Sequence, residues 1–226
     1  MIPRILVDSA LMPDGGGEIR LLRRGDEYSI MLGATELMNS RLSGSEEALA
    51  QIACARIAGP SRPRVLIGGL GMGFTLRAAL AALGEDSQVT VAELVPAVLA
   101  WARGPLSHIF GTSLSDPRVR IVEEDVAKPI AGAKVAWDAI LLDVDNGPDA
   151  LTRKANDRLY DRAGLHAARA ALRPGGVLGI WSSAPDRAFT KRLRDSGFAV
   201  EEMSARARGG RSGARHNLWF ASPRRL

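Results

Sequence analysis

The chain has 226 residues, of which 46% are hydrophobic and 24% charged. These values are ordinary for a soluble globular protein and exclude a disordered, collagen-like or disulfide-rich chain. The formal net charge is +5, and six arginines within residues 204–226 account for it, because without them 24 basic residues face 25 acidic ones. The basic balance therefore indicates a solvated C-terminal segment, and we do not expect nucleic acid as a partner.

The cysteine content and the hydropathy of the sequence indicate the cellular compartment in which we expect the protein. The single cysteine, Cys54, can form no internal disulfide and no multi-cysteine zinc site, so we expect a cytoplasmic protein without a metal. The N-terminus lacks the apolar core of a signal peptide. The most hydrophobic stretch, Val65–Leu83, contains four glycines and Arg77 and divides into a strand, a turn and a helix, so no membrane span is expected.

Residues 1–58 are predicted to form a small β-rich region that ends in a helix. The predicted strands are Glu18–Arg24, Glu27–Leu32 and Ala34–Met38. Gly25-Asp26 is a hairpin turn dipeptide between the first two. Ser45-Glu46-Glu47 opens an apolar run to Ile57, with acids where a helix begins. Because Gly59–Pro63 holds two prolines and a glycine, we place a boundary there, and residues 59–226 form the second domain.

From Arg64 onward, strands and helices alternate. The predicted strands are Val65–Ile67, Gln88–Ala92, Val119–Val122, Trp137–Leu142, Val177–Trp181, Phe198–Met203 and Asn217–Ala221, and the predicted helices are Thr75–Leu83, Val95–Arg103, Leu159–Leu172 and Asp186–Ser196. Alternating βα units with short buried strands predict an α/β fold with a mostly parallel, seven-stranded sheet and helices on both faces.

Open α/β sheets bind ligands at the carboxyl ends of their strands. The first strand runs directly into a glycine turn and a helix, and the turn glycines are Gly68, Gly69, Gly71 and Gly73. The second strand ends at Glu93, where a carboxylate can accept hydrogen bonds from both ribose hydroxyls, and Asp125 follows the third strand, placed for an adenine amino group. Together they predict a nucleoside site. The alternative is that Glu93 and Asp125 only cap the helices that follow.

The end of the chain helps to choose the nucleoside. An antiparallel strand pair closes the sheet, which is usual for the Rossmann-like fold of S-adenosylmethionine-dependent transferases and favours that ligand class over a dinucleotide.

The fourth strand of the parallel sheet ends in Asp143 and Asp145. Two carboxylates there suit a cationic amine substrate, because one attracts the ammonium and the other accepts a proton so that the nitrogen can attack. An Asx turn ended by Gly147-Pro148 is the alternative; it explains Asn146 better than Asp143.

With these motifs the chain resembles the spermidine synthase (polyamine aminopropyltransferase) family over about residues 18–200. The resemblance rests on the glycine turn, on Glu93, on Asp116–Val119 and above all on the aspartate-rich Asp143–Pro148. It implies decarboxylated S-adenosylmethionine as the aminopropyl donor, Asp143 as proton acceptor, and a homodimer in which the N-terminal region covers the site or pairs with a second subunit.

The sequence also departs from the family pattern. Gly71 stands where the family has an aspartate facing the aminopropyl amine, Asn146 stands for a later acid of the aspartate motif, and Glu36 lies where a cofactor-contacting Gln is common. The N-terminal helix offers Glu46 and Glu47, without the family's Tyr or His, to bind the distal ammonium of a polyamine.

Two aromatic residues are further candidates for substrate contact. Tyr160 begins the long helix after the aspartate motif and Trp181 ends the fifth strand, although core packing is the default interpretation of both. Three functions stay open: aminopropyl transfer, methyl transfer from intact S-adenosylmethionine to an unknown acceptor, and nucleoside binding without catalysis.

Overall fold

The N-terminal sheet is a four-stranded antiparallel meander. The structure, a computed structural model, describes residues 2–13, 15–57, 59, 61–144, 157–208 and 214–224. The meander strands, in spatial order, are β1 (Ile5–Leu11), β2 (Glu18–Arg24), β3 (Glu27–Leu32) and β4 (Thr35–Asn39). Gly25 has a φ of 61°, so the β2–β3 turn adopts the left-handed conformation that its glycine was expected to supply. Strand β1 was not predicted, because most of its residues are exposed and it shows no alternation.

The larger sheet has seven strands in the order β10-β11-β9-β8-β5-β6-β7. Its strands are β5 (Arg64–Gly68), β6 (Gln88–Ala92), β7 (Val119–Val122), β8 (Trp137–Leu142), β9 (Leu172–Ser182), β10 (Phe198–Arg206) and β11 (Arg215–Pro223). The five from β9 to β7 run parallel, whereas β11 pairs antiparallel with both β9 and β10. Every residue of β8 is buried, as its continuous apolar sequence predicts for a central strand.

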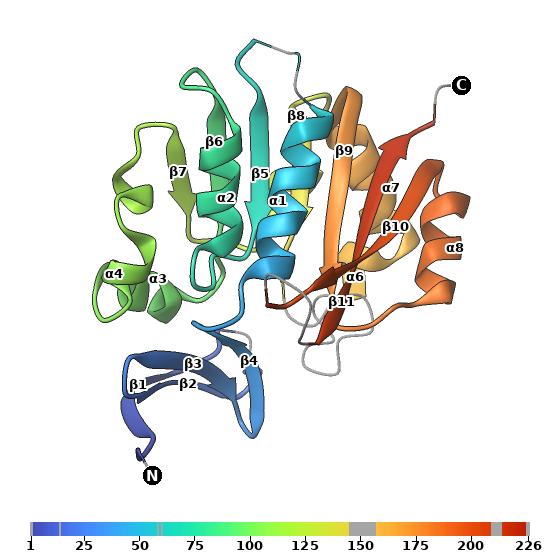
Figure 1. The fold of residues 1–226 in the computed structure, drawn as a ribbon. Coiled ribbons are helices and arrows are strands. Elements are labelled where there is room, and N and C mark those ends of the chain that lie inside the picture. Colours follow the sequence, from blue (N-terminus) through green and yellow to red (C-terminus); the bar gives the residue numbers. More distant parts are fainter. Residues whose placement is uncertain are drawn as a thin grey trace.

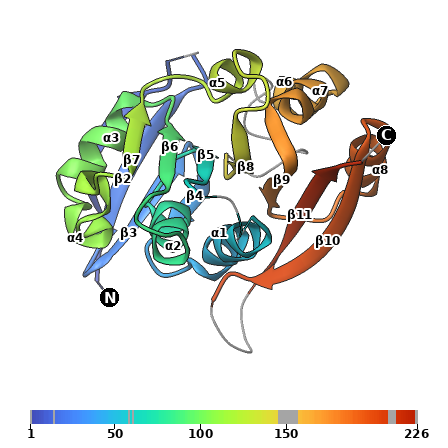
Figure 2. The ribbon, with the colours of Figure 1, turned by 90° about the horizontal axis from the view of Figure 1, so that it is seen from above.

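Helices cover both faces of this sheet (Figures 1 and 2). They are α1 (Gly44–Arg56), α2 (Phe74–Ala82), α3 (Pro96–Arg103), α4 (Ser107–Phe110), α5 (Ala127–Ala131), α6 (Asp157–Tyr160), α7 (Arg162–Ala171) and α8 (Arg187–Asp195), with a 3-10 turn at Ser113–Ser115. One hydrophobic core lies beneath α1, α2 and α3, and a second lies beneath α5, α7 and α8. The predicted α/β fold with a mostly parallel seven-stranded sheet is confirmed.

The segment after β8 differs from its prediction in two places. The single helix expected over Leu159–Leu172 is two helices, because Asp161 is extended at ψ 174° and its side chain caps α7 by accepting a hydrogen bond from Gly164 N. Strand β9 begins at Leu172 rather than Val177, since Leu172 already pairs with Trp137 and the register shift at Trp137/Ala139 absorbs the intervening residues.

The N-terminal sheet lies below the carboxyl edge of the parallel strands in Figure 1. Side chains of β2 and β3 belong to the same core as α1, α2 and α3. Trp101 on α3 donates from Nε1 to Asp8 Oδ2 on β1 over 2.7 Å, which fastens the two parts together. Helix α1 packs on α2 and β9, so it covers the larger sheet although it precedes the expected boundary.

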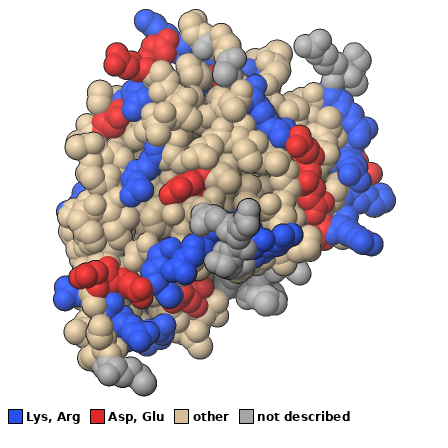
Figure 3. Space-filling model, viewed as in Figure 1, with Lys and Arg blue, Asp and Glu red and all other residues tan. Residues whose placement is uncertain are grey.

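The outer surface carries mixed charge. Figure 3 shows acidic and basic side chains interspersed among uncharged ones on the face seen in Figure 1. Within the part of the chain that the structure describes, no helix is long and apolar enough to cross a membrane, and Val65–Leu83 divides into β5, the glycine turn and α2.

Candidate active site

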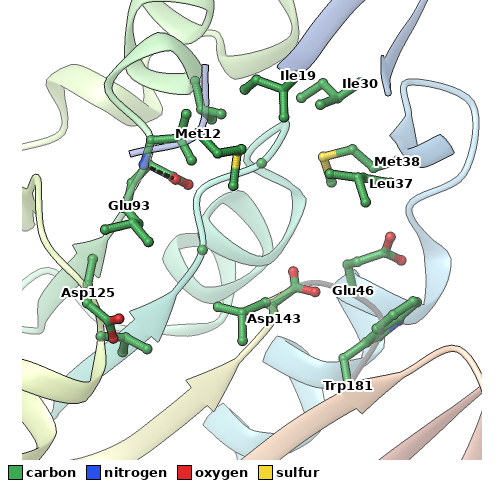
Figure 4. Close-up of a pocket in the computed structure, with 18 of the residues that line it drawn as sticks. Met12, Ile19, Ile30, Leu37, Met38, Glu46, Glu93, Asp125, Asp143 and Trp181 are labelled. Carbon is green, nitrogen blue, oxygen red and sulfur yellow. Dashed lines mark hydrogen bonds between the residues drawn. The ribbon is translucent and has the colours of Figure 1, made fainter. Parts of the chain in front are cut away.

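A cavity of about 140 Å³, partly open to solvent, lies between the carboxyl edge of the parallel sheet and the N-terminal sheet. Its floor comes from the residues that follow four adjacent strands: Gly69 after β5, Glu93 after β6, Asp125 after β7 and Asp143 after β8. Its opposite wall is apolar and consists of Met12, Ile19, Ile30, Leu37 and Met38 (Figure 4). The few polar groups among apolar walls are typical of a small-molecule site.

The glycine turn brings the backbone close to the end of β8. Gly69 has a φ of +87°, and a Cβ there would lie 2.4 Å from the carbonyl oxygen of Asp143. Gly71 has a φ of +49°, and a Cβ there would lie 2.7 Å from the thioether of Met38. Both therefore require glycine. Gly69 and Gly71 line the cavity, whereas Gly68 and Gly73 make room for Val126 and Phe110.

Glu93 lies in the cavity with its carboxylate held by the backbone. Oε2 accepts a hydrogen bond from Leu70 N over 2.9 Å, and Oε1 accepts from Val95 N over 2.8 Å. Burial raises the pKa of Glu93, and the backbone N–H donors oppose that rise. Glu93 thus ties the glycine turn to the start of α3 and also lines the cavity, where a ligand hydroxyl would meet its carboxylate.

Asp125, like Glu93, both accepts a hydrogen bond from the backbone and lines the cavity. Its Oδ1 accepts a hydrogen bond from Ala127 N over 2.8 Å at the start of α5, as the capping interpretation expects, and its Oδ2 forms an ion pair with Arg158. The residue also lines the cavity. A ligand amino group would therefore share Asp125 with Arg158, whose side chain is 60% exposed.

Asp143, which is half-buried, and Glu46, which is buried, form a pair of carboxyl groups on one side of the cavity, and Figure 4 shows both pointing into it. Burial raises the pKa of Asp143 to about 6, against a 2.5 Å hydrogen bond from Thr75 Oγ1 to Asp143 Oδ2. Burial and repulsion by Asp143 raise the pKa of Glu46 to about 7. Because both pKa values are raised toward neutrality, the two carboxyl groups can take up or release a proton near neutral pH.

Three residues near this pair were not identified from the sequence as site residues. Thr75 comes from the first turn of α2, Ser45 from the start of α1, and His216 from β11, more than 170 positions beyond Ser45. Their separation along the chain explains why no local motif signalled them. Only Ser45 could have been suggested by the sequence, because it is adjacent to the predicted site residue Glu46.

The remaining candidates fall inside and outside the cavity. Trp181 lines it and donates from Nε1 to Ser45 Oγ over 3.0 Å. Glu47 is half-buried on α1 and is not among the lining residues. Tyr160 is 1% exposed and packs edge-to-face on Phe189 in the core of the opposite face, so the structure places it away from the cavity. Asp145 lies outside the described residues.

Comparison with known proteins gives a consistent set of relatives. No family model matches the chain. A polyamine aminopropyltransferase of Mycobacterium tuberculosis is 31% identical over 193 residues, which is 81% of this chain and 35% of that protein. The chain thus spans about a third of the length of the curated relatives it matches.

Solved structures resemble the whole architecture. Spermidine synthase from Thermotoga maritima superposes with a TM-score of 0.76 at 20% identity, covering 96% of this chain and 72% of that one. Human methyltransferase-like protein 13 in complex with SAH has a TM-score of 0.60 at 20% identity, covering 80% and 82% of the two chains. The first match includes the N-terminal sheet, and both support the fold.

Proposed function

Because this chain is a spermidine synthase-like protein, we propose that it is a transferase that moves an aminopropyl group from decarboxylated S-adenosylmethionine to an amine such as putrescine. The observation that carries the proposal is the Asp143–Glu46 pair of carboxyl groups, which shares one cavity with Glu93 and the glycine turn. The cavity thus combines groups suited to a nucleoside with groups suited to an ammonium ion.

The proposed division of roles follows from the donors and acceptors available. Glu93 would hold the ribose hydroxyls and Asp125 the adenine amino group, beside Gly69 and Gly71, where the backbone lies closest to the ligand. Asp143 would take a proton from the ammonium, because only the neutral amine has the lone pair that forms the new C–N bond while the C–S bond to the sulfonium breaks. Glu46 would bind the distal ammonium of the substrate, so that the neutral nitrogen at its other end lies in line for that attack. A contribution from Asp145 is part of the proposal and concerns a residue outside those described.

Methyl transfer from intact S-adenosylmethionine is the second candidate, and Gly71 favours it. At this position the family pattern has an aspartate that would face the amine of the decarboxylated donor. Here the thioether of Met38 occupies the space that a side chain at position 71 would need. The wall therefore offers neither attraction for that amine nor repulsion for the carboxylate of the intact cofactor.

Calorimetric titration with each of the two nucleosides, followed by putrescine and product analysis, separates these functions. Preference for the decarboxylated donor together with spermidine formation supports aminopropyl transfer, whereas preference for the intact cofactor supports methyl transfer. Binding without turnover under either condition would indicate a non-catalytic relative. The Asp143→Asn variant should reduce any turnover by about 10²-fold or more, as expected on loss of a general base.

We also propose that the protein is a cytoplasmic homodimer with two domains. Strand β1 forms an edge of the N-terminal sheet and exposes Ile5, Leu6 and Leu11, which is consistent with a homodimer. Sedimentation that finds only monomer at micromolar concentration would contradict it. The buried, unpaired thiol of Cys54 is consistent with a reducing cytoplasm. We retain residues 1–58 and 59–226 as the proposed domain division.

A further inference from the structure

A chain of hydrogen bonds leads from the carboxyl pair to His216, near the start of β11. Ser45 Oγ lies 2.6 Å from Glu46 Oε2 and 2.7 Å from His216 Nδ1. Ser45 is fully buried, Glu46 is 7% exposed and the His216 ring is half-buried. The series Glu46, Ser45, His216 therefore runs from the cavity outward.

Trp181 limits the hydrogen bonds that Ser45 can make with Glu46 and His216. Its Nε1–H has no acceptor lone pair, so the 3.0 Å contact uses one of the two lone pairs on Ser45 Oγ. Ser45 is left with one proton and one lone pair for two neighbours. It must donate to one of Glu46 and His216 and accept from the other.

Only two arrangements satisfy both contacts. In the first, Glu46 is a carboxylate that accepts from Ser45, and His216 donates from Nδ1. In the second, protonated Glu46 donates to Ser45, and Ser45 donates to an unprotonated Nδ1 of His216. The two differ by a proton on Glu46 and by the histidine tautomer, which is the property required of a proton relay.

The proposed reaction needs such a path. Transfer of an alkyl group from a sulfonium to an ammonium forms one C–N bond, breaks one C–S bond with its electron pair going to sulfur, and releases one proton for each turnover. In the proposed scheme, Asp143 takes that proton first and passes it to Glu46, the other member of the pair, which must lose it before the next turnover. This holds for aminopropyl and for methyl transfer alike.

We propose that Ser45 and His216 carry this proton from Glu46 to solvent. The inference rests on the proposed function. Glu46 passes its proton to Ser45 Oγ, Ser45 passes its own to His216 Nδ1, and His216 loses the proton of Nε2 to water. Exchange of the ring protons with water then restores the tautomer. His216 is a positioning residue in this scheme, because it acts through Ser45.

The surroundings of His216 suit a relay. Trp181 packs edge-to-face on its ring with centroids 4.6 Å apart, which orients Nδ1 toward Ser45. Burial lowers the pKa of His216, so the ring is neutral at neutral pH and does not retain the proton. The charged neighbours are Arg215 on β11 and its partner Arg206 on β10, beside the His216–Ala205 pair. At the inner end, Asp143 and Glu47 act on Glu46.

The first test uses the His216→Ala variant with imidazole added back. We expect kcat to fall about tenfold with little change in KM for the amine, and millimolar imidazole to restore it in proportion to its concentration. Wild type and the matched His166→Ala variant, which changes an exposed histidine on α7, should not respond to imidazole. A loss in His216→Ala that imidazole leaves unchanged would mean that the histidine is only structural.

The second test does not require turnover. The chain has three histidines, so NMR titration of the ring signals can assign His216 by comparison with His216→Ala. If the relay exists, Glu46→Gln shifts the titration midpoint of His216 and changes its tautomer ratio, whereas Glu123→Gln, which changes an exposed carboxyl group outside the cavity lining, leaves both unchanged. Coincident titration curves in wild type and Glu46→Gln overturn the relay. Coupling seen here without turnover on any amine would instead contradict the proposed function alone.

Discussion

Thr75 donates a 2.5 Å hydrogen bond from Oγ1 to Asp143 Oδ2, and so joins the first turn of α2 to the end of β8. Thr75 is 3% exposed. Asp143 Oδ1 accepts no hydrogen bond from the residues that the structure describes, so one carboxylate oxygen is fixed and the other faces the cavity. A proton acceptor that is held in this way keeps its orientation without losing its basic oxygen.

Replacing this hydroxyl should move the acidic limb of the pH–rate profile. Thr75→Val keeps the shape of the side chain and removes the donor that holds down the pKa of Asp143. That pKa should rise above about 6, and turnover at pH 7 should fall several-fold and recover at higher pH. Steady-state rates between pH 5 and 9 test this, with Thr75→Ser as the control that keeps the donor. Superimposable profiles for Thr75→Val and wild type would rule the role out.

The carboxyl groups of Glu46 and Asp143 should also lower the stability of the folded protein at high pH. Glu46 titrates near 4.5 when unfolded and near 7 when folded, so its stabilising contribution is complete below about pH 4.5 and is lost as the pH rises to about 7. Asp143 has the same sign. Glu46→Gln should therefore melt higher than wild type at pH 8 and similarly at pH 4.5, by about 2–4 °C for each kcal/mol regained.

Thermal unfolding at the two pH values checks this expectation. Glu123→Gln is the matched control, because Glu123 is exposed and lies outside the cavity lining. An equal difference in melting temperature at both pH values would show that the substitution acts through packing and not through charge.

Sequence patterns predicted most of the larger sheet, because buried strands and glycine turns are local signals. The bounds of β6, β7 and β8 match their predicted ranges, and the residues expected at four strand ends lie in one cavity. Strand ends of a parallel sheet share an edge whatever the loops do, which is why Glu93 and Asp143 could be placed beside each other in advance.

The apolar wall and the outer part of the site could not be predicted in this way. Met38 lies over Gly71 because of how the N-terminal sheet packs on α1 and α3, and His216 approaches Ser45 because β11 is inserted between β9 and β10. Both contacts depend on long-range packing. Tyr160 fails as a cavity residue for the same reason, since its ring turns into the core between β9 and α8.

Glu93 should dominate nucleoside binding. Glu93→Gln keeps one acceptor but introduces an amide NH₂ that faces the N–H of Leu70 or Val95, so we expect at least about a tenfold loss in affinity, with a smaller effect on the amine. Titration calorimetry with S-adenosylmethionine or its decarboxylated form measures this. Glu123→Gln, an exposed neighbour of the cavity residue Glu124, is the control and should bind as wild type does. Unchanged affinity in Glu93→Gln would show that Glu93 only ties the glycine turn to α3.

Gly71 and Met38 should together determine the choice of donor. A Cβ at position 71 would collide with the Met38 thioether, so Gly71→Asp alone should bind either nucleoside at least about tenfold more weakly. Met38→Ala removes the obstruction, and Asp tolerates the left-handed backbone at this position better than most residues do. In the Gly71→Asp, Met38→Ala double variant the new carboxylate would face the donor tail, where it attracts an amine and repels a carboxylate. We therefore expect the double variant to favour the decarboxylated donor over S-adenosylmethionine more strongly than Met38→Ala does. Affinities of both nucleosides for all four proteins give the coupling between the two positions, and additive effects would mean that Met38 does not shape the donor site.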